Sequence, residues 1–161
     1  MGNVLHTMLE TAEDTISLGK SLSVCLGGRG HVSLYGGLGA GKTTLCRGIL
    51  RAMGYQGAVK SPTFTLVEPY QFEEGQVFHF DLYRLNDSDE LEYIGIDDYF
   101  NDRNLCLVEW PEKAKDSLPA ADLDVKLSIM GKSRCIDITP NSDFGSVVLE
   151  NLKQRLSGYR S

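Results

Sequence analysis

Apolar side chains recur at helical spacing in three parts of the chain. The first part follows Thr11, a residue type that favours the N-terminal cap of a helix, and stops at Gly27-Gly28. The second runs from Gly41 to Met53, and the third from Asp143 to Leu156. Apolar positions three or four residues apart indicate a helix with one buried face, so helices are expected over these three ranges. The chain is thus expected to start with a helix.

Shorter apolar segments predict strands. His31–Tyr35 and Asn104–Val108 are compact runs typical of buried strands. Two further pairs of segments predict β-hairpins because each pair flanks turn-forming residues. The first pair is Phe64–Tyr70 and Gln76–Asp81 around Glu73-Glu74-Gly75, and the second is Asp122–Met130 and Ser133–Thr139 around Gly131-Lys132.

The stretch after the first hairpin predicts short helices. Ser88 is followed by acidic residues, as at many helix N-termini, so a helix is expected over Ser88–Tyr93 and a continuation at Ile96–Phe100. Taken together, the pattern predicts an α/β fold. A small central parallel sheet is flanked by helices, and antiparallel hairpin strands form its edges.

Length and composition favour one globular domain over residues 1–161. Apolar residues make up 42% of the chain and charged residues 24%, which argues against wholesale disorder. No apolar stretch approaches the length of a membrane span, and no secretory signal is visible at the start, so a cytoplasmic protein with no membrane partner is expected. Its cysteines are far apart and include no C-x-x-C pair, so we expect buried, reduced thiols without a metal role. They are Cys25, Cys46, Cys106 and Cys135.

The net charge of −6 is unevenly distributed. Residues 73–124 contain fifteen acidic side chains against four basic ones, whereas both flanking parts are slightly basic. Binding to a nucleic-acid phosphate backbone needs a basic surface, so this chain alone is a poor candidate for it. The acidic part is expected to be either a solvated face or a docking surface for a basic partner.

A phosphate-binding motif follows the predicted strand His31–Tyr35. Residues 36–43 read Gly-Gly-Leu-Gly-Ala-Gly-Lys-Thr, which matches G-x-x-x-x-G-K-[ST] at a strand-to-helix junction. The glycines let successive backbone N–H groups from Gly39 to Thr44 point at one anion, and the helix N-terminus favours negative charge there. Lys42 would bridge the β- and γ-phosphates, and the Thr43 hydroxyl would ligate Mg²⁺. The sequence therefore predicts a P-loop nucleotide-binding fold.

Two acidic residues end predicted strands. Asp81 follows the apolar residues 77–80, and Glu109 follows residues 105–108. Ligands of open α/β sheets bind beyond the carboxyl ends of the strands, so both acids are candidates to hold Mg²⁺ and position a water molecule. Ser61-Pro62-Thr63 presents two hydroxyls on a proline-fixed turn and is a candidate loop near the γ-phosphate.

Two other polar residues have open interpretations. His79 lies inside an apolar strand, and we expect a packed, hydrogen-bonded core histidine there. Arg84 could stabilise transition-state charge, or form a surface salt bridge to the acidic stretch.

These motifs together resemble one family. Gly36–Thr44, Ser61–Thr65, His79–Arg84 and Leu107–Pro111 are similar, in order and spacing, to the motifs of the bacterial TsaE (YjeE) P-loop ATPases. The combination of S-P-T-F-T, H-x-D-x-Y-R and E-W is far more specific than the phosphate loop alone. Gly37 departs from the family, in which this position often holds an acid.

The resemblance implies a cytosolic ATPase that binds ATP and Mg²⁺ and is required to form threonylcarbamoyladenosine at position 37 of tRNA. In that family the protein works with TsaB and TsaD and meets tRNA only through their complex. Asp81 and Glu109 then become the catalytic acids, and both join Thr43 as candidate metal ligands. The expected nucleotide-binding residues are Gly37, Leu38, Gly39, Ala40, Gly41, Lys42, Thr43, Thr44, Thr63 and Trp110.

Other P-loop functions compete with this interpretation. A small-molecule kinase would use Asp81 as the base for a substrate hydroxyl, but no arginine-bearing lid is evident between Trp110 and Gly131. A GTPase is disfavoured because the chain lacks Asn-Lys-x-Asp. A nucleotide-sensing module without hydrolysis remains an alternative, against which the two acids argue.

Overall fold

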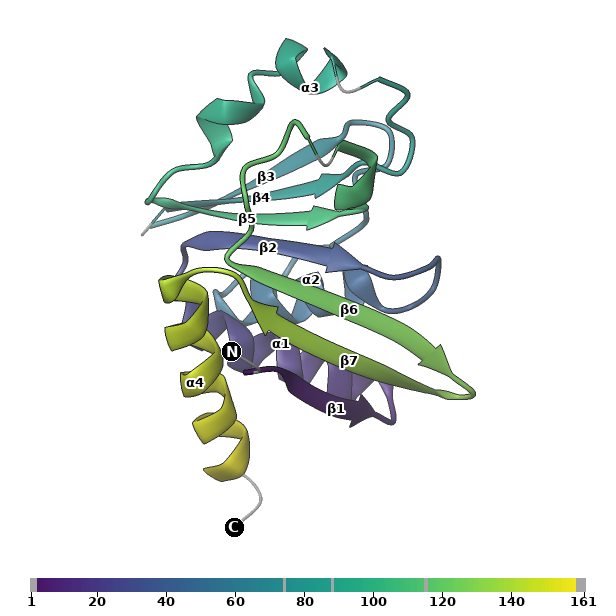
Figure 1. Cartoon of the computed structure of the whole chain (residues 1–161), viewed down its shortest axis with the longest axis vertical. Helices are drawn as coiled ribbons and strands as arrows, with labels where there is room; N and C mark the ends of the chain where they lie inside the picture. The colour runs from purple at the N-terminus through teal and green to yellow at the C-terminus, as the bar shows by residue number, and fades with distance from the viewer. Residues whose placement is uncertain (1–2, 74, 88, 115, 159–161) are drawn as a thin grey trace.

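One sheet dominates the computed structural model, which describes residues 3–73, 75–87, 89–114 and 116–158. Within these residues the sheet has seven strands in the order β1-β7-β6-β2-β5-β4-β3 (Figure 1). The strands are β1 (Leu5–Leu9), β2 (Gly30–Tyr35), β3 (Val67–Phe72), β4 (Gly75–Asp81), β5 (Asn104–Glu109), β6 (Leu123–Met130) and β7 (Ser133–Pro140). The helices are α1 (Ala12–Leu26), α2 (Lys42–Ala52), α3 (Asp89–Tyr93) and α4 (Asp143–Gly158), with 3₁₀ turns η1 (Ile96–Tyr99) and η2 (Pro111–Ala114).

The predicted α/β sheet is confirmed. The neighbours β6, β2, β5 and β4 run parallel, while β3 pairs antiparallel with β4, and β7 pairs antiparallel with β6. The parallel strands thus form the middle, and the two hairpins lie toward its edges. The hairpin turn at Glu74 and the helix start at Ser88 lie outside the described residues.

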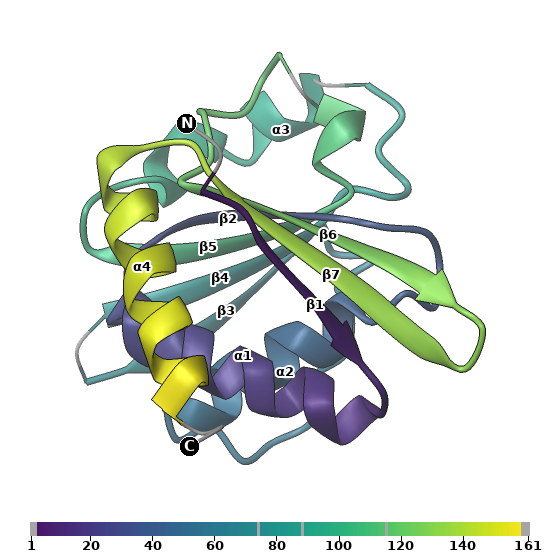
Figure 2. The same ribbon diagram turned by 60° about the horizontal axis from the view of Figure 1, so that its bottom comes forward.

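Helices α1, α2 and α4 lie together on one side of the sheet (Figure 2). Their apolar side chains pack with those of the sheet into a large core that includes Leu22, Ile49, Leu149 and Ile138. A second core lies between β4, β5 and the short helices, where Phe80, Leu91 and Val108 are buried. Strands β4 and β5 thus contribute alternate side chains to the two cores, which lie on opposite faces of the sheet.

Helix α1 begins as the sequence predicts and packs very closely on α2. Thr11 and Asp14 form a reciprocal capping box, in which each side chain accepts a hydrogen bond from the other residue's backbone N–H. Gly48 lies so close to α1 that a Cβ there would come within 2.3 Å of the Ile16 carbonyl oxygen. The absence of a side chain at Gly48 therefore sets the distance between the two helices.

Strand β1 was not expected from the sequence, which placed a helix first. It pairs antiparallel with β7, so that His6 lies opposite Asp137. Along β1 exposure alternates, with Leu9 buried toward the helices and His6 and Met8 exposed on the other side. The helix-free face of β1, β7 and β6 is thus open to solvent.

Two further expectations were wrong in detail. Phe64 was placed in a strand, but it lies in a turn with 84% of its surface exposed, and β3 starts only after Leu66. Leu66 has a positive φ of 69°, which an extended strand does not allow. The cysteines are free, as expected, but only Cys46 and Cys106 are buried, whereas Cys25 and Cys135 are half-buried.

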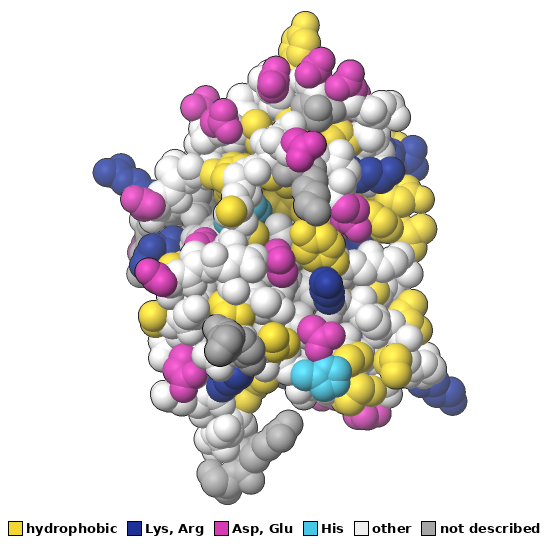
Figure 3. All heavy atoms as spheres, in the orientation of Figure 1, with side chains coloured by type: hydrophobic (Ala, Val, Ile, Leu, Met, Phe, Trp, Pro, Cys, Tyr) yellow, Lys and Arg dark blue, Asp and Glu magenta, His cyan; other side chains and the backbone are white. Residues whose placement is uncertain are grey.

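Part of the acidic stretch lies at one end of the molecule. Acidic side chains gather over the end that carries α3 (Figure 3), where Asp89, Glu90 and Glu92 lie in the first turn of that helix. None of the described helices is both long and apolar enough to cross a bilayer.

Candidate functional site

Three strand ends meet at the candidate site. β2 leads into the phosphate loop, β4 ends in Asp81, and β5 ends in Glu109. In the sheet register Glu109 lies beside Leu34 of β2 and beside Asp81 of β4. Residues that are far apart in the chain are therefore brought to one edge of the sheet, as expected for the carboxyl ends of parallel strands.

The phosphate loop ends at an uncapped helix N-terminus. Gly41 precedes α2 with a φ of 109°, a conformation that side chains strongly disfavour, and no side chain caps the helix there. The first backbone N–H groups of α2 therefore have no side-chain acceptor. Such donors, together with the positive end of the helix dipole, suit an anionic ligand such as a phosphate.

Lys42 is the first residue of α2 and is only 5% exposed. Its ammonium group donates a hydrogen bond to the Gly36 carbonyl over 2.6 Å and lies 3.7 Å from the centre of the Trp110 ring. Burial lowers the pKa of Lys42, although the nearby carboxylate of Glu109 opposes that shift. The ammonium group is thus held at the mouth of the loop by contacts that a phosphate could replace.

Glu109 connects the phosphate loop to β4. One of its carboxylate oxygens, Oε2, accepts a hydrogen bond from the Thr43 hydroxyl at 2.9 Å and lies 2.6 Å from Nε2 of His79. Both Glu109 and His79 are buried. His79 is indeed a packed, hydrogen-bonded residue, and its partner is a predicted site acid.

Asp81 is also buried, but its partners come from other elements. Its Oδ2 accepts hydrogen bonds from the hydroxyls of Ser61 and Thr63, and its Oδ1 accepts one from the Tyr83 backbone N–H at 2.9 Å. The Ser61-Pro62-Thr63 turn is therefore anchored to the end of β4. Both hydroxyls of this turn face the site, as the sequence suggested.

Aromatic side chains form one wall of the site. Trp110 follows β5 with a positive φ of 58°, a strained conformation for a bulky residue. Its ring lies against that of Tyr83, with ring centres 4.9 Å apart. The guanidinium of Arg84 lies over the exposed Phe64 ring at 4.5 Å. Arg84 therefore has a contact that neither sequence interpretation included.

A cavity of about 480 Å³ lies among these groups. Every predicted site residue except Gly37 lines this cavity. Ser61, Tyr83 and Arg84 line it as well, although the sequence analysis did not place them in the binding set. The lining residues are Leu38, Gly39, Ala40, Gly41, Lys42, Thr43, Thr44, Ser61, Thr63, Asp81, Tyr83, Arg84, Glu109 and Trp110.

A signal for the role of His79 was present in the sequence. His79 and Asp81 are two residues apart on β4, and side chains at that spacing lie on the same face of a strand. The alternation thus places His79 on the side of the site acids. Its apolar neighbours Phe78 and Phe80 point to the other face, into the second core.

The donors in the cavity fit a hard cation such as Mg²⁺. The Thr43 hydroxyl and the Glu109 carboxylate are already in contact, and the Asp81 carboxylate ends the adjacent strand. Oxygen donors of this kind are what Mg²⁺ prefers. Cys46 lies close to His79 and Glu109, but burial raises the pKa of its thiol well above the ordinary value, which disfavours the thiolate form that binds metals.

Comparisons with known proteins agree on one family. The family model described as threonylcarbamoyl adenosine biosynthesis protein TsaE matches residues 9–136. The tRNA threonylcarbamoyladenosine biosynthesis protein TsaE of Haemophilus influenzae is 49% identical over 118 residues, which cover 73% of this chain and 75% of that protein. The Aquifex aeolicus protein of the same name is 36% identical over 131 residues, which cover 80% of this chain and 90% of that protein.

A solved structure confirms the fold. The crystal structure of Bacillus subtilis YdiB superposes with a TM-score of 0.80 at 27% sequence identity and covers 94% of this chain and 95% of that one. The match of the family model over most of the chain, together with these relatives, shows that the chain belongs to the TsaE family of tRNA threonylcarbamoyladenosine biosynthesis proteins.

Proposed function

We propose that this chain binds ATP with Mg²⁺ and hydrolyses it slowly as a subunit of the machinery that forms N6-threonylcarbamoyladenosine at position 37 of tRNA. The family supports the process, because its members are named for this biosynthesis. The observation that carries the chemistry is the 2.9 Å contact between the Thr43 hydroxyl and Glu109, next to the buried Lys42. A phosphate-binding lysine, a metal-binding hydroxyl and a carboxylate are the parts that nucleotide hydrolysis needs.

The loop and α2 supply binding. The free N–H groups at the start of α2 would hold the phosphates, and the Lys42 ammonium would exchange the Gly36 carbonyl for a phosphate oxygen. Thr43 would hold Mg²⁺ through its hydroxyl oxygen, with Glu109 beside it. When bound, Mg²⁺ would neutralise charge on the phosphates.

The two acids have different surroundings, and this suggests different roles. Glu109 contacts Thr43 and is oriented by His79, so its carboxylate is well placed to act at the metal and on a water molecule. Both oxygens of Asp81 accept hydrogen bonds from the chain itself. We therefore assign to Asp81 chiefly the positioning of the Ser61–Thr63 turn, through which nucleotide binding could be relayed to the surface.

The proposed partners are TsaB and TsaD, whose complex this ATPase would drive or reset between turnovers. The acidic end around α3 fits a protein that docks on a partner and meets tRNA only through it. The carbamoyl transfer itself would belong to TsaD. Such a role places the chain in the cytoplasm.

The hydrogen bonds of Asp81 argue against a function as a small-molecule kinase. A kinase would need the Asp81 carboxylate free to accept a proton from a substrate hydroxyl. Instead, the hydroxyls of Ser61 and Thr63 already occupy its Oδ2. A nucleotide sensor without hydrolysis would use the same binding groups, and only turnover separates it from the proposed ATPase.

The proposal can be tested in bacterial cells that lack the gene. Mass spectrometry of tRNA nucleosides would measure threonylcarbamoyladenosine after complementation with the wild type, with Lys42→Ala, or with the exposed control Lys132→Ala. We expect the wild type and the control to restore the nucleoside and Lys42→Ala to fail. Failure of the wild type would reject the process, and full rescue by Lys42→Ala would reject a role for ATP binding.

A further inference from the structure

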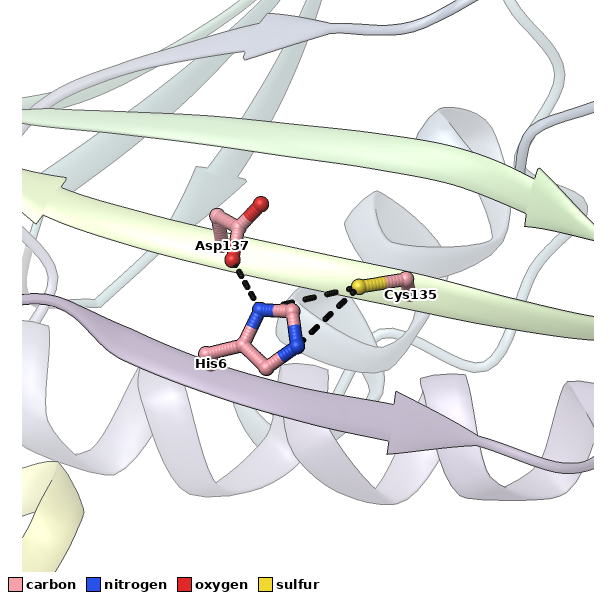
Figure 4. Close-up of side chains that lie close together, drawn as sticks. All are labelled: His6, Cys135 and Asp137. Atoms are coloured by element: carbon pink, nitrogen blue, oxygen red, sulfur yellow. Dashed lines mark hydrogen bonds and ion pairs between the residues drawn. The ribbon is translucent and has the colours of Figure 1, made fainter.

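Three side chains with metal-binding atoms lie together on the open face of the sheet, remote in sequence from the phosphate loop. Cys135 and Asp137 are two residues apart on β7, and His6 lies opposite Asp137 on β1. Because strand side chains alternate, all three project from the same face (Figure 4). The thiol, the imidazole and the carboxylate thus come from two strands whose sequence positions are far apart.

The distances among the three groups suit one small cation. Each has a ligand atom within 4.8 Å of the other two. The Cys135 sulfur lies 3.7 Å from both Nδ1 and Nε2 of His6, and Nδ1 is hydrogen-bonded to Oδ1 of Asp137. A tetrahedral zinc ion with ordinary Zn–S and Zn–N bonds holds its sulfur and nitrogen ligands about 3.6 Å apart. Coordination by both groups requires the exposed His6 and Asp137 side chains to separate around the ion, with their hydrogen bond replaced by two bonds to it.

The trio is accessible from solvent. The His6 side chain is 64% exposed and that of Asp137 is 39% exposed, so an ion could enter without opening the fold. The exposed imidazole can also turn to direct its nitrogen at an ion. Three ligands on an open face leave a fourth position for water.

We propose that His6, Cys135 and Asp137 form a binding site for a thiophilic divalent cation of the zinc type. Cys135 would bind as the thiolate, with its proton released to solvent, and His6 would bind through a neutral ring nitrogen. Sulfur and imidazole ligands select such a metal over Mg²⁺, which prefers oxygen donors like those beside Thr43. The site is therefore chemically distinct from the nucleotide cavity.

Metal binding here would fasten an edge strand. Among the described strands, β1 pairs only with β7. The proposed ligands lie on these same two strands. An ion held by His6 on β1 and by Cys135 and Asp137 on β7 would add a link between them. Because the unfolded chain does not bring these ligands together, binding should raise the thermal stability of the protein.

The test uses the full chain after treatment with a chelator. Zn²⁺ affinity would be measured by competition with a chromophoric chelator, and Co²⁺ would be added separately because its absorption reports thiolate coordination. We expect one Zn²⁺ bound by wild type, with affinity lowered about tenfold or more in both Cys135→Ser and His6→Ala. Cys25→Ser is the matched control, since Cys25 is also half-buried but lies on α1 outside the trio.

Two readouts decide the outcome. The thiolate absorption of the Co²⁺ form should disappear in Cys135→Ser and persist in Cys25→Ser, and Zn²⁺ should raise the melting temperature of wild type but not of Cys135→Ser. Unchanged Zn²⁺ affinity in Cys135→Ser would overturn the proposal. Loss of the absorption in Cys46→Ala, with retention in Cys135→Ser, would also overturn it by assigning the thiolate to the cluster beside Glu109.

Discussion

The hydroxyl of Thr43 donates a hydrogen bond to the carboxylate of Glu109 over 2.9 Å, although 66 positions separate them in the chain. Thr43 belongs to the first turn of α2, and Glu109 ends β5. The contact joins the phosphate loop to the strand that supplies the candidate catalytic acid. The proposed roles, phosphate binding by the loop and catalysis by Glu109, can be tested by separate substitutions.

Replacing Glu109 should abolish hydrolysis but not nucleotide binding. Glu109→Gln keeps an oxygen that can accept from Thr43 but removes the charge, so ATP affinity in calorimetry should stay close to that of wild type. Loss of a general base costs about 100-fold or more in rate. Phosphate release in the presence of the partner complex measures the effect, with Glu112→Gln, outside the cavity, as control. Normal turnover in Glu109→Gln would remove this residue from the mechanism.

Replacing Lys42 should abolish ATP binding, and Trp110 provides an optical signal for it. The chain has one tryptophan, and the Lys42 ammonium lies 3.7 Å from the centre of its ring. When Lys42 moves to a phosphate, this contact weakens and the tryptophan fluorescence should change. Titration with ATP should give a saturable change in wild type and none in Lys42→Ala. If calorimetry shows that the wild type binds ATP but its fluorescence does not change, Lys42 stays over the Trp110 ring when ATP binds.

Acidification should destabilise the fold through His31. Burial among Phe100 and neighbouring groups lowers the pKa of His31 from 6.5 to about 4, although Asp122 and Asp124 partly oppose the shift. The unfolded chain therefore takes up a proton first as the pH falls from 6.5 toward 4, and the free energy of unfolding declines over that window.

Over the whole window, this titration should lower the free energy of unfolding by about 3 kcal/mol. Urea unfolding at pH 7, 6, 5 and 4 measures it. His31→Gln should flatten this part of the profile, whereas the exposed control His6→Gln should keep it. An unchanged slope in His31→Gln would assign the acid sensitivity to other groups.

Adding a methyl group at Gly48 should separate α1 from α2. The new Cβ would come within 2.3 Å of the Ile16 carbonyl oxygen, a backbone atom that cannot rotate away. Gly48→Ala should lower the free energy of unfolding by about 1–3 kcal/mol despite the better helix propensity of alanine. In Gly37→Ala the new Cβ would meet no atom within 4 Å, so its urea midpoint should match that of wild type.

The parallel centre of the fold and most residues that line the candidate cavity followed from local patterns. Helical spacing located α1, α2 and α4, and the strand-end acids Asp81 and Glu109 do lie beside the phosphate loop. β1 was missed because Leu5–Leu9 has only a few apolar residues on one face, and its pairing partner comes late in the chain. Such non-local pairing leaves little trace in a short sequence window.

Individual side-chain environments were harder to predict than strand ends. His79 was correctly expected to be packed, but its bond to Glu109 depends on the register between β4 and β5. The turn at Leu66, which exposes Phe64, depends on a backbone conformation that the apolar sequence does not indicate. The meeting of Cys135 with His6 likewise needed the unexpected strand β1.

The place of β1 at the edge beside β7 has a consequence for biosynthesis. Leu5–Leu9 is synthesised well before the residues with which it pairs, Arg134–Ile138, because every other described strand lies between them in the chain. This strand must remain unpaired with its native neighbour while the rest of the sheet is made. Completion of that edge is therefore a long-range step in folding that follows synthesis of β7, and the nascent chain needs to keep β1 from pairing elsewhere until then.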